Sequence, residues 1–126
     1  KKTITKRLLT ACNSPYVKLI SHPTGRLLLQ RESYEADWPK IFEACVKTKT
    51  ALEINSWPSR LDLPDTLVRE GRKLGVKFII NTDAHETSQM DNMFYGVSVA
   101  RRGWATKEDI LNTLSWLEFK RWFGVS

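Results

Sequence analysis

The sequence predicts an α/β fold in which about four parallel strands, with flanking helices, form part of a (β/α) barrel. Patterns typical of helices and of strands alternate along the chain, which favours parallel strands joined by crossover helices. The strand-like runs are largely apolar, as expected for parallel strands that are buried on both faces. Four strands are fewer than a closed barrel requires, and the chain opens with a helix. We therefore expect residues 1–126 to be a single domain that corresponds to the last part of a barrel.

The first elements are a helix, a strand and a second helix. Apolar residues at helical spacing predict a helix over residues 3–12. Residues 17–21 form the first expected strand, and a long polar loop over residues 23–37 follows it. A second helix over residues 38–49 is expected because Asp37 is a good N-cap.

The middle of the chain contains the clearest strand signals. Residues 50–55 and residues 76–80 are the second and third expected strands. The third is a continuous β-branched and aromatic run. Between them, a helix over residues 64–74 ends at Gly75, a residue that commonly follows a helix.

The last third is expected to add one more strand and two helices. A short helical turn over residues 89–94 precedes a fourth strand over residues 95–100. A helix begins at Thr106, with Asp109 at the capping-box position. Residues 115–123 form a final amphipathic helix.

The composition is that of a soluble globular protein, with 41% hydrophobic and 27% charged residues. No apolar run is long enough to span a bilayer, so we expect a cytoplasmic protein without a membrane partner. Cys12 and Cys45 lack the spacing of a zinc knuckle and are expected to be reduced thiols. The net charge of +6 is compatible with a nucleic-acid or phosphate partner, although many basic proteins bind neither.

Both histidines of the chain stand just past an expected strand. His22 follows the first strand, and His85 follows the third strand together with Asp83. Ligands gather where parallel strands end, and mixed histidine and carboxylate ligands suit zinc, manganese or iron. The alternative for each is structural: Asp83 would cap a turn, and the histidines would be ordinary loop residues.

Five further residues are candidates for roles at the same end of the strands. Glu53 lies within an apolar strand and needs a partner, so it either forms a structural pair or supports a metal-bound group. Asn55 ends that strand. Arg26 has a guanidinium suited to a forked contact with phosphate, and Arg101 and Arg102 precede Trp104 in a loop suited to a nucleic-acid backbone and a stacked base. For the two last arginines, the alternative is a solvated turn beside a core tryptophan.

Eight short strings, taken in order, resemble the C-terminal half of the PHP (polymerase and histidinol phosphatase) domain. The resemblance covers nearly the whole chain and is greatest to the PHP domains attached to family X DNA polymerases. Any single string is weak evidence, but eight in order are specific. The strings are SHPTGRLL at 21–28, TALEIN at 50–55, RLDLPD at 60–65, NTDAH at 81–85, MDNM at 90–93, YGV at 95–97, ARRGW at 100–104 and LNTL at 111–114.

This resemblance implies a distorted (β/α)7 barrel with a metal centre at the carboxyl ends of its strands. It implies that His22, Asp83 and His85 are metal ligands, and this mixed set of ligands suits divalent manganese, zinc or iron. Glu53 does not correspond to the bridging glutamate of the family, and its supporting role is expected from its place in the strand. Arg26 and Asn55 are then expected to act in catalysis, and Arg26, Arg101 and Arg102 to bind phosphate. The implied chemistry is metal-assisted hydrolysis of phosphate esters, in family X polymerases at the 3′ ends of DNA.

The chain also departs from the family. The early His-x-His motif, a further aspartate, the middle histidines and the bridging glutamate have no counterpart, so two histidines cannot supply the full set of ligands. The metal site is therefore expected to be incomplete, and activity weak or absent without the missing half of the barrel. The alternative is a truncated, non-catalytic module. Such a module would associate with a second copy of itself or with the missing half, or would bind nucleic acid.

Overall fold

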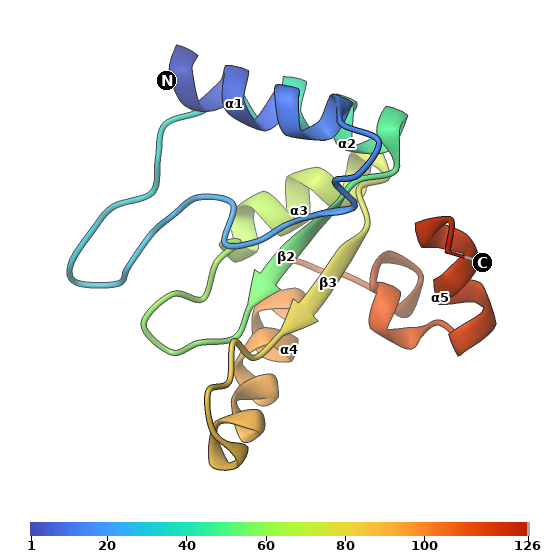
Figure 1. Ribbon diagram of the computed structural model, residues 1–126. Helices are drawn as coiled ribbons and strands as arrows, with labels where there is room; N and C mark the ends of the chain where they lie inside the picture. The colour runs from blue at the N-terminus through green and yellow to red at the C-terminus, as the bar shows by residue number, and fades with distance from the viewer. Residues whose placement is uncertain (126) are drawn as a thin grey trace.

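A three-stranded parallel sheet is the centre of the molecule, in a computed structural model that describes residues 1–125. Strand β1 covers Leu19–Ile20, β2 covers Ala51–Asn55 and β3 covers Phe78–Asn81. Figure 1 shows the two longer strands, β2 and β3, as arrows. The order is β1-β2-β3, so each crossover moves one strand further along the sheet. The carboxyl ends of all three strands consequently lie at the same end of the sheet, which is called the carboxyl edge below.

The helices connect the strands and cover the sheet. Helix α2 ends at Lys49, which has a left-handed φ of 53°, and α3 ends at Gly75, whose φ of 93° suits a residue without a Cβ. A capping box between Ser115 and Glu118 starts α5. The α-helices are α1 (Lys2–Asn13), α2 (Trp38–Thr48), α3 (Asp65–Leu74), α4 (Met93–Arg102) and α5 (Trp116–Phe123), and the 3-10 helices are η1 (Thr87–Asn92), η2 (Lys107–Asp109) and η3 (Leu111–Thr113).

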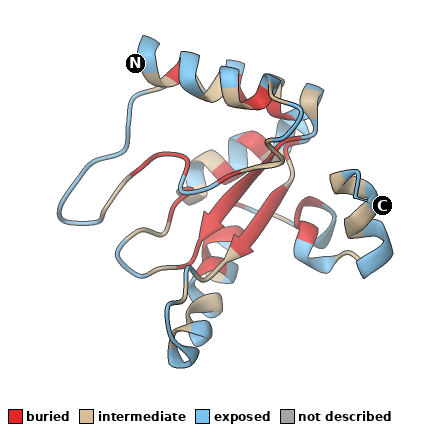
Figure 2. Ribbon diagram, in the orientation of Figure 1, coloured by how far each residue is buried: buried red, intermediate tan, exposed pale blue. Residues whose placement is uncertain are grey.

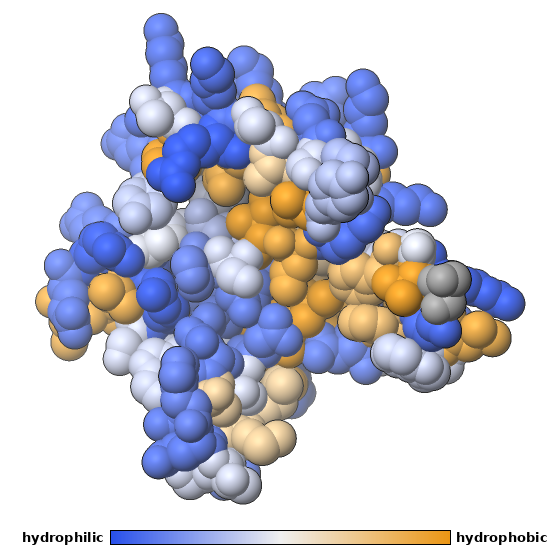
Figure 3. Space-filling view, in the orientation of Figure 1, coloured by the Kyte–Doolittle hydropathy of each residue, from blue (hydrophilic) through white to orange (hydrophobic). Residues whose placement is uncertain are grey.

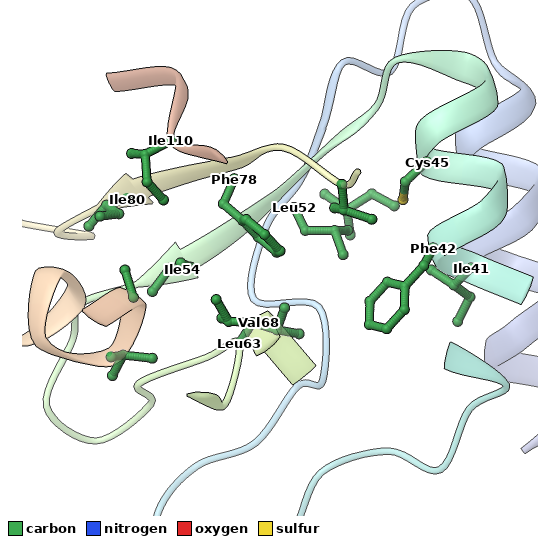
Figure 4. Close-up of a cluster of buried hydrophobic side chains, with 14 of the residues drawn as sticks. Ile41, Phe42, Cys45, Leu52, Ile54, Leu63, Val68, Phe78, Ile80 and Ile110 are labelled. Atoms are coloured by element: carbon green, nitrogen blue, oxygen red, sulfur yellow. The ribbon is translucent and has the colours of Figure 1, made fainter. Parts of the chain in front are cut away.

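The main core lies between one face of the sheet and helices α2, α3 and α4. Leu52 and Ile54 of β2 and Phe78 of β3 are completely buried there, against Phe42 and Val68 of the helices (Figure 4). Fully burying one such side chain contributes about 1.5–3 kcal/mol. Figure 2 shows that the strands are the most continuously buried part of the chain.

The opposite face of the sheet has a smaller core. Ala51 and Ile79 are buried there beside Leu111, and Phe119 and Trp122 of α5 pack against them. Hydrophobic side chains gather over the middle of the molecule and toward α5 in the same view, with hydrophilic side chains around them (Figure 3). This second face is less completely covered than the first, since Leu19 beside it stays partly exposed.

The expected fourth strand is wrong, because residues 95–100 lie in the helix α4. The alternating apolar residues suggested a strand, but Gly96, Val99, Ala100 and Gly103 recur at helical spacing and are all buried. This small-residue face lets α4 pack closely on the sheet. Packing has therefore overridden the local preference for a strand.

A different segment lies beside β3. Ile110 forms an isolated parallel bridge with Phe78. Asn112 then bonds to both main-chain groups of Ile80: its Oδ1 accepts from Ile80 N at 2.8 Å, and its Nδ2 donates to Ile80 O at 2.9 Å. The side-chain amide of Asn112 thus takes the place of a peptide group in a neighbouring strand.

The remaining elements follow the expectations with shifted ends. The first strand is shorter than predicted, and the helix expected from Thr106 consists of two 3-10 turns, although the predicted capping box between Thr106 and Asp109 is present. Cys12 and Cys45 are free and buried, with their sulfur atoms 3.7 Å apart. Within residues 1–125, no helix is long and apolar enough to cross a membrane. The α/β class is confirmed, and a three-stranded parallel sheet is consistent with part of a (β/α) barrel.

Candidate functional site

The carboxylate of Glu53 joins three parts of the molecule at the carboxyl edge of the sheet. Its side chain belongs to β2 and is 5% exposed. Oε2 accepts from the main-chain nitrogen of His22 at 2.6 Å, and Oε1 accepts from Nδ2 of Asn81 at 3.1 Å. The carboxylate therefore ties the loop after β1 to the end of β3, and its need for buried partners is met.

Asn55 extends this network to Asp83. It ends β2 and is 1% exposed. Its Nδ2 lies 3.3 Å from Oε2 of Glu53 and 3.2 Å from Oδ2 of Asp83, while its Oδ1 accepts from the main-chain nitrogen of Trp57 at 2.9 Å. The buried amide of Asn55 thus fixes the relative positions of the Glu53 carboxylate, the Asp83 carboxylate and the main chain at Trp57.

The residues at the ends of this network are exposed and have unusual backbone conformations. His22 has a φ of 32° and Asp83 a φ of 56°, the left-handed region that few side chains adopt. Residues held in such uncommon backbone conformations cluster at functional sites. The buried pair of Glu53 and Asn55 therefore holds the main chain of His22 and the carboxylate of Asp83, and both residues are exposed.

His85 is held less directly. Its main-chain nitrogen donates to Oε1 of Gln89 at 2.7 Å, and its ring faces the edge of Trp57 with the two centroids 6.1 Å apart. The side chain is exposed. His85 therefore lies beside the loop that follows Asn55, and its link to the network runs through Trp57.

Arg26 is engaged with main-chain carbonyls. Its Nε donates to the oxygen of Arg60 at 2.8 Å, and its Nη2 donates to the oxygen of Leu61. Burial lowers the pKa of Arg26, and the neighbouring carboxylates of Asp62 and Asp65 oppose this effect. These contacts join the loop after β1 to the loop after β2 and leave Nη1 of Arg26 for another acceptor.

Asp62 and Thr24 form a second buried connection that the sequence did not reveal. Both are completely buried, and the main-chain nitrogen of Thr24 lies 3.1 Å from each carboxylate oxygen of Asp62. Burial raises the pKa of Asp62, while hydrogen bonds from Thr24 and Gly25 and the charge of Arg26 oppose it. The only sequence signal was the position of Asp62 in the string RLDLPD, between an apolar loop residue on each side. Asn81 was missed in the same way, at the end of the third strand.

Arg101 and Arg102 do not follow a strand. They form the last turn of α4, and Nε of Arg102 lies 3.6 Å from Oδ2 of Asp65. Trp104 follows them, with the guanidinium of Arg69 stacked 3.6 Å from its ring centroid. Among the described residues, no hydrogen bond or ion pair joins these arginines to His22, Asp83 or His85.

The three predicted metal ligands do not make a complete site by themselves. Among residues 1–125, no three side chains of histidine, cysteine, aspartate or glutamate are placed to hold one metal ion. Asp83 is the candidate most firmly oriented by its surroundings, through Asn55. A metal at this edge of the sheet would need ligands in addition to those the described residues bring together.

Comparison with known proteins relates the chain to enzymes that act on phosphate esters or DNA. No protein-family model matches it. It is 45% identical over 112 residues, or 89% of its length, to the DNA polymerase/3′-5′ exonuclease PolX of Bacillus subtilis (strain 168). It is 25% identical over 115 residues, or 86% of its length, to probable phosphatases of Thermoanaerobacter sp. (strain X514) and Thermoanaerobacter pseudethanolicus.

The chain spans only part of each relative. The matched region is 20% of the polymerase and 44% of each phosphatase. Within the polymerase it falls in the C-terminal part. The resemblance drawn from the eight strings is therefore confirmed, and this chain is homologous to the C-terminal part of a family X DNA polymerase/3′-5′ exonuclease.

Proposed function

We propose that this chain is the C-terminal part of a PHP-type phosphoesterase domain that hydrolyses phosphate esters, with DNA 3′ ends as the substrate class. One observation carries the proposal. The buried pair of Glu53 and Asn55 joins the two exposed loops that carry His22 and Asp83. The printed names of the relatives, an exonuclease and two phosphatases, support the same class of reaction.

In this proposal, His22, Asp83 and His85 contribute to a site for a divalent ion, namely manganese, zinc or iron. The described residues do not form a complete set, so in the isolated chain water would fill the remaining positions around a weakly held ion, and in a longer protein further side chains would fill them. When bound, such an ion acts as a Lewis acid toward a phosphate oxygen and activates water.

The chain's own residues position these groups. Glu53 fixes the main chain at His22, so the direction of the histidine depends on a buried carboxylate. Asn55 orients Asp83 by donating to its Oδ2. Nη1 of Arg26 is left to contact a phosphate oxygen, because Nε and Nη2 donate to carbonyls. Arg101 and Arg102 are exposed and are proposed to contact DNA phosphates further along the substrate.

Metal binding tests this proposal. Isothermal titration of the 126-residue chain with manganese chloride should detect binding, and Asp83→Ala or His85→Ala should weaken it at least about tenfold, as loss of one ligand typically does. Asp91→Ala removes a carboxylate of the same size from an exposed position on η1 and serves as the matched control.

The proposal fails if the wild-type chain binds no manganese, zinc or iron, or if Asp91→Ala weakens binding as much as Asp83→Ala. Hydrolysis of a model phosphodiester with manganese is the second measurement. A wild-type rate above the protein-free background that Asp83→Ala leaves unchanged would remove the catalytic part of the proposal.

A second candidate function is a non-catalytic module that associates with itself. The specific observation in its favour is the position of β1, which is an edge strand with β2 as its one neighbour among the described residues. An edge of this kind presents unpaired main-chain groups to another chain.

A further inference from the structure

A groove of about 330 Å³ lies between α1 and the loop after β1, beside His22. Helix α1 forms one wall, and residues 21–34 contribute the other; both are seen in Figure 1 in the blue part of the chain. The volume falls within the range of small-molecule sites. Of the candidate ligands and phosphate-binding residues discussed above, His22 alone lines this groove.

The groove is positively charged. Arg7 of α1 and Arg31 of the loop line it together with His22, and none of the residues that line it carries a carboxylate. In a chain with fourteen acidic residues, a pocket with two arginines and no acid is suited to an anion.

Arg31 is held in place by its own loop. Its Nε donates to the oxygen of Gly25 at 2.8 Å, and its guanidinium lies 5.8 Å from the ring centroid of Tyr34. Tyr34 in turn donates its main-chain N–H to Thr24 O at 2.8 Å. The terminal nitrogens of Arg31 are thus presented by a side chain whose direction is fixed, which lowers the entropy lost on binding.

Apart from Ser21, the other side chains that line the groove are apolar or aromatic. Ile4 and Leu8 of α1 and Ile20 of β1 line it, and Tyr34 adds an aromatic ring. An inorganic anion would use only the arginines. A ligand with an anionic group and a flat apolar body would use both walls, and a nucleotide has this combination.

We propose that this groove binds a nucleotide, with Arg7 and Arg31 on its phosphate and the base against Ile4, Leu8 and Tyr34. The proposal rests on the function proposed above, because it places the phosphate beside His22. It adds two arginines to the phosphate contact proposed for Nη1 of Arg26, whose Nε and Nη2 donate to the oxygens of Arg60 and Leu61.

Titration of the 126-residue chain with deoxyadenosine monophosphate in EDTA tests the groove without any metal. Arg7→Gln and Arg31→Gln should each weaken binding about tenfold, the loss expected for one charge-assisted contact. Arg121→Gln is the matched control, because it removes an exposed arginine from the last turn of α5. It should leave the affinity unchanged.

Several results would overturn the assignment. These are no binding by the wild type, an equal loss in Arg121→Gln, or no loss in Arg7→Gln, a variant in which no described hydrogen bond of a side chain is removed. Inorganic phosphate serves as a second ligand. It should bind at least about tenfold more weakly than the nucleotide, and equal affinities would exclude a role for the apolar wall.

The two proposals can fail separately. Nucleotide binding that depends on Arg7 and Arg31, in a chain that binds no metal, supports the groove and contradicts the metal centre. Metal binding that depends on Asp83, in a chain that binds no nucleotide, supports the metal centre and contradicts the groove. Circular dichroism of Arg31→Gln, together with the Arg7→Gln result, separates loss of the contact from misfolding of the loop.

Discussion

At the scale of single residues, buried polar side chains connect the loops at the carboxyl edge of the sheet. Glu53 and Asn55 connect His22 to Asp83, and Asp62 holds the segment around Thr24. A buried polar group without a partner is costly, so each member of such a network constrains the others. The geometry of the exposed residues therefore depends on residues that no substrate would touch.

Asp62 makes the stability of this edge depend on pH. Burial raises its pKa above the ordinary value of 3.8, so the folded protein holds the proton more strongly than the unfolded chain. Its contribution to stability is fully present below pH 3.8 and is lost as the pH rises through the folded-state pKa. Asp62→Asn should remove this loss, so the stability of the variant relative to the wild type should be higher at pH 7 than at pH 4.

Urea unfolding at both pH values measures the effect. The exposed change Asp91→Asn is the control for removing one negative charge. If the free energies of unfolding of the wild type and of Asp62→Asn differ by the same amount at both pH values, this role of Asp62 is contradicted.

At the scale of elements, the helices include both successes and a failure of sequence-based prediction. Helices α2 and α3 were predicted well because capping residues and apolar periodicity agree there. Residues 95–100 were mispredicted as a strand because the alternation of apolar residues is a local pattern. The helix that forms there depends on packing against the sheet, which is a long-range contact. Ser56 shows how tight that contact is, since its buried Oγ has no hydrogen-bond partner among the described residues and lies against Gly96.

Gly96 should be intolerant of any side chain. A Cβ at this position would overlap Oγ of Ser56 and come within 2.5 Å of Cγ2 of Ile80, so α4 would have to move away from the sheet. Gly96→Ala should lower the free energy of unfolding by about 1–3 kcal/mol, as overpacking typically does.

Ser98→Ala, two residues further along α4 on a partly exposed position, is the control. Thermal denaturation monitored by circular dichroism compares the two variants. Equal melting temperatures for Gly96→Ala and the wild type would show that α4 does not rest on the sheet in this way.

The candidate site was predictable in part. The positions of His22, Asp83 and Asn55 after apolar strands were enough to place them at one edge, because parallel strands end together. The contacts of Asn81 and Asp62 depend on which loops fold toward each other, and Arg101 and Arg102 were misplaced with the fourth strand. The sequence holds no local signal for such long-range contacts.

At the scale of the whole molecule, the sheet is only partly enclosed. Helices α2, α3 and α4 cover one face, whereas α5 and Leu111 cover part of the other. Large apolar side chains remain exposed on several elements, including Phe94 at 71% and Trp116 at 73%. Exposed apolar surface of this kind marks interaction sites.

We therefore expect the chain to associate with a second copy or with the rest of a longer protein. Size-exclusion chromatography with light scattering should give a mass above the 14.6 kDa of one chain at micromolar concentration. A charge in β1, as in Leu19→Lys, should shift the mass toward one chain, and the exposed change Lys47→Glu on α2 should not. Because Leu19 also packs against the second core, circular dichroism is needed to show that Leu19→Lys is folded. A single sharp peak of monomer mass for the wild type would contradict the expectation.

The side-chain amide of Asn112 limits the side of the sheet on which a partner strand can add. By bonding to both main-chain groups of Ile80, it occupies positions that an incoming strand would need beside β3. The opposite edge, at β1, has no such closing group among the described residues. A partner can therefore extend the sheet on one side only, so growth stops after a single addition unless the partner brings an open edge of its own.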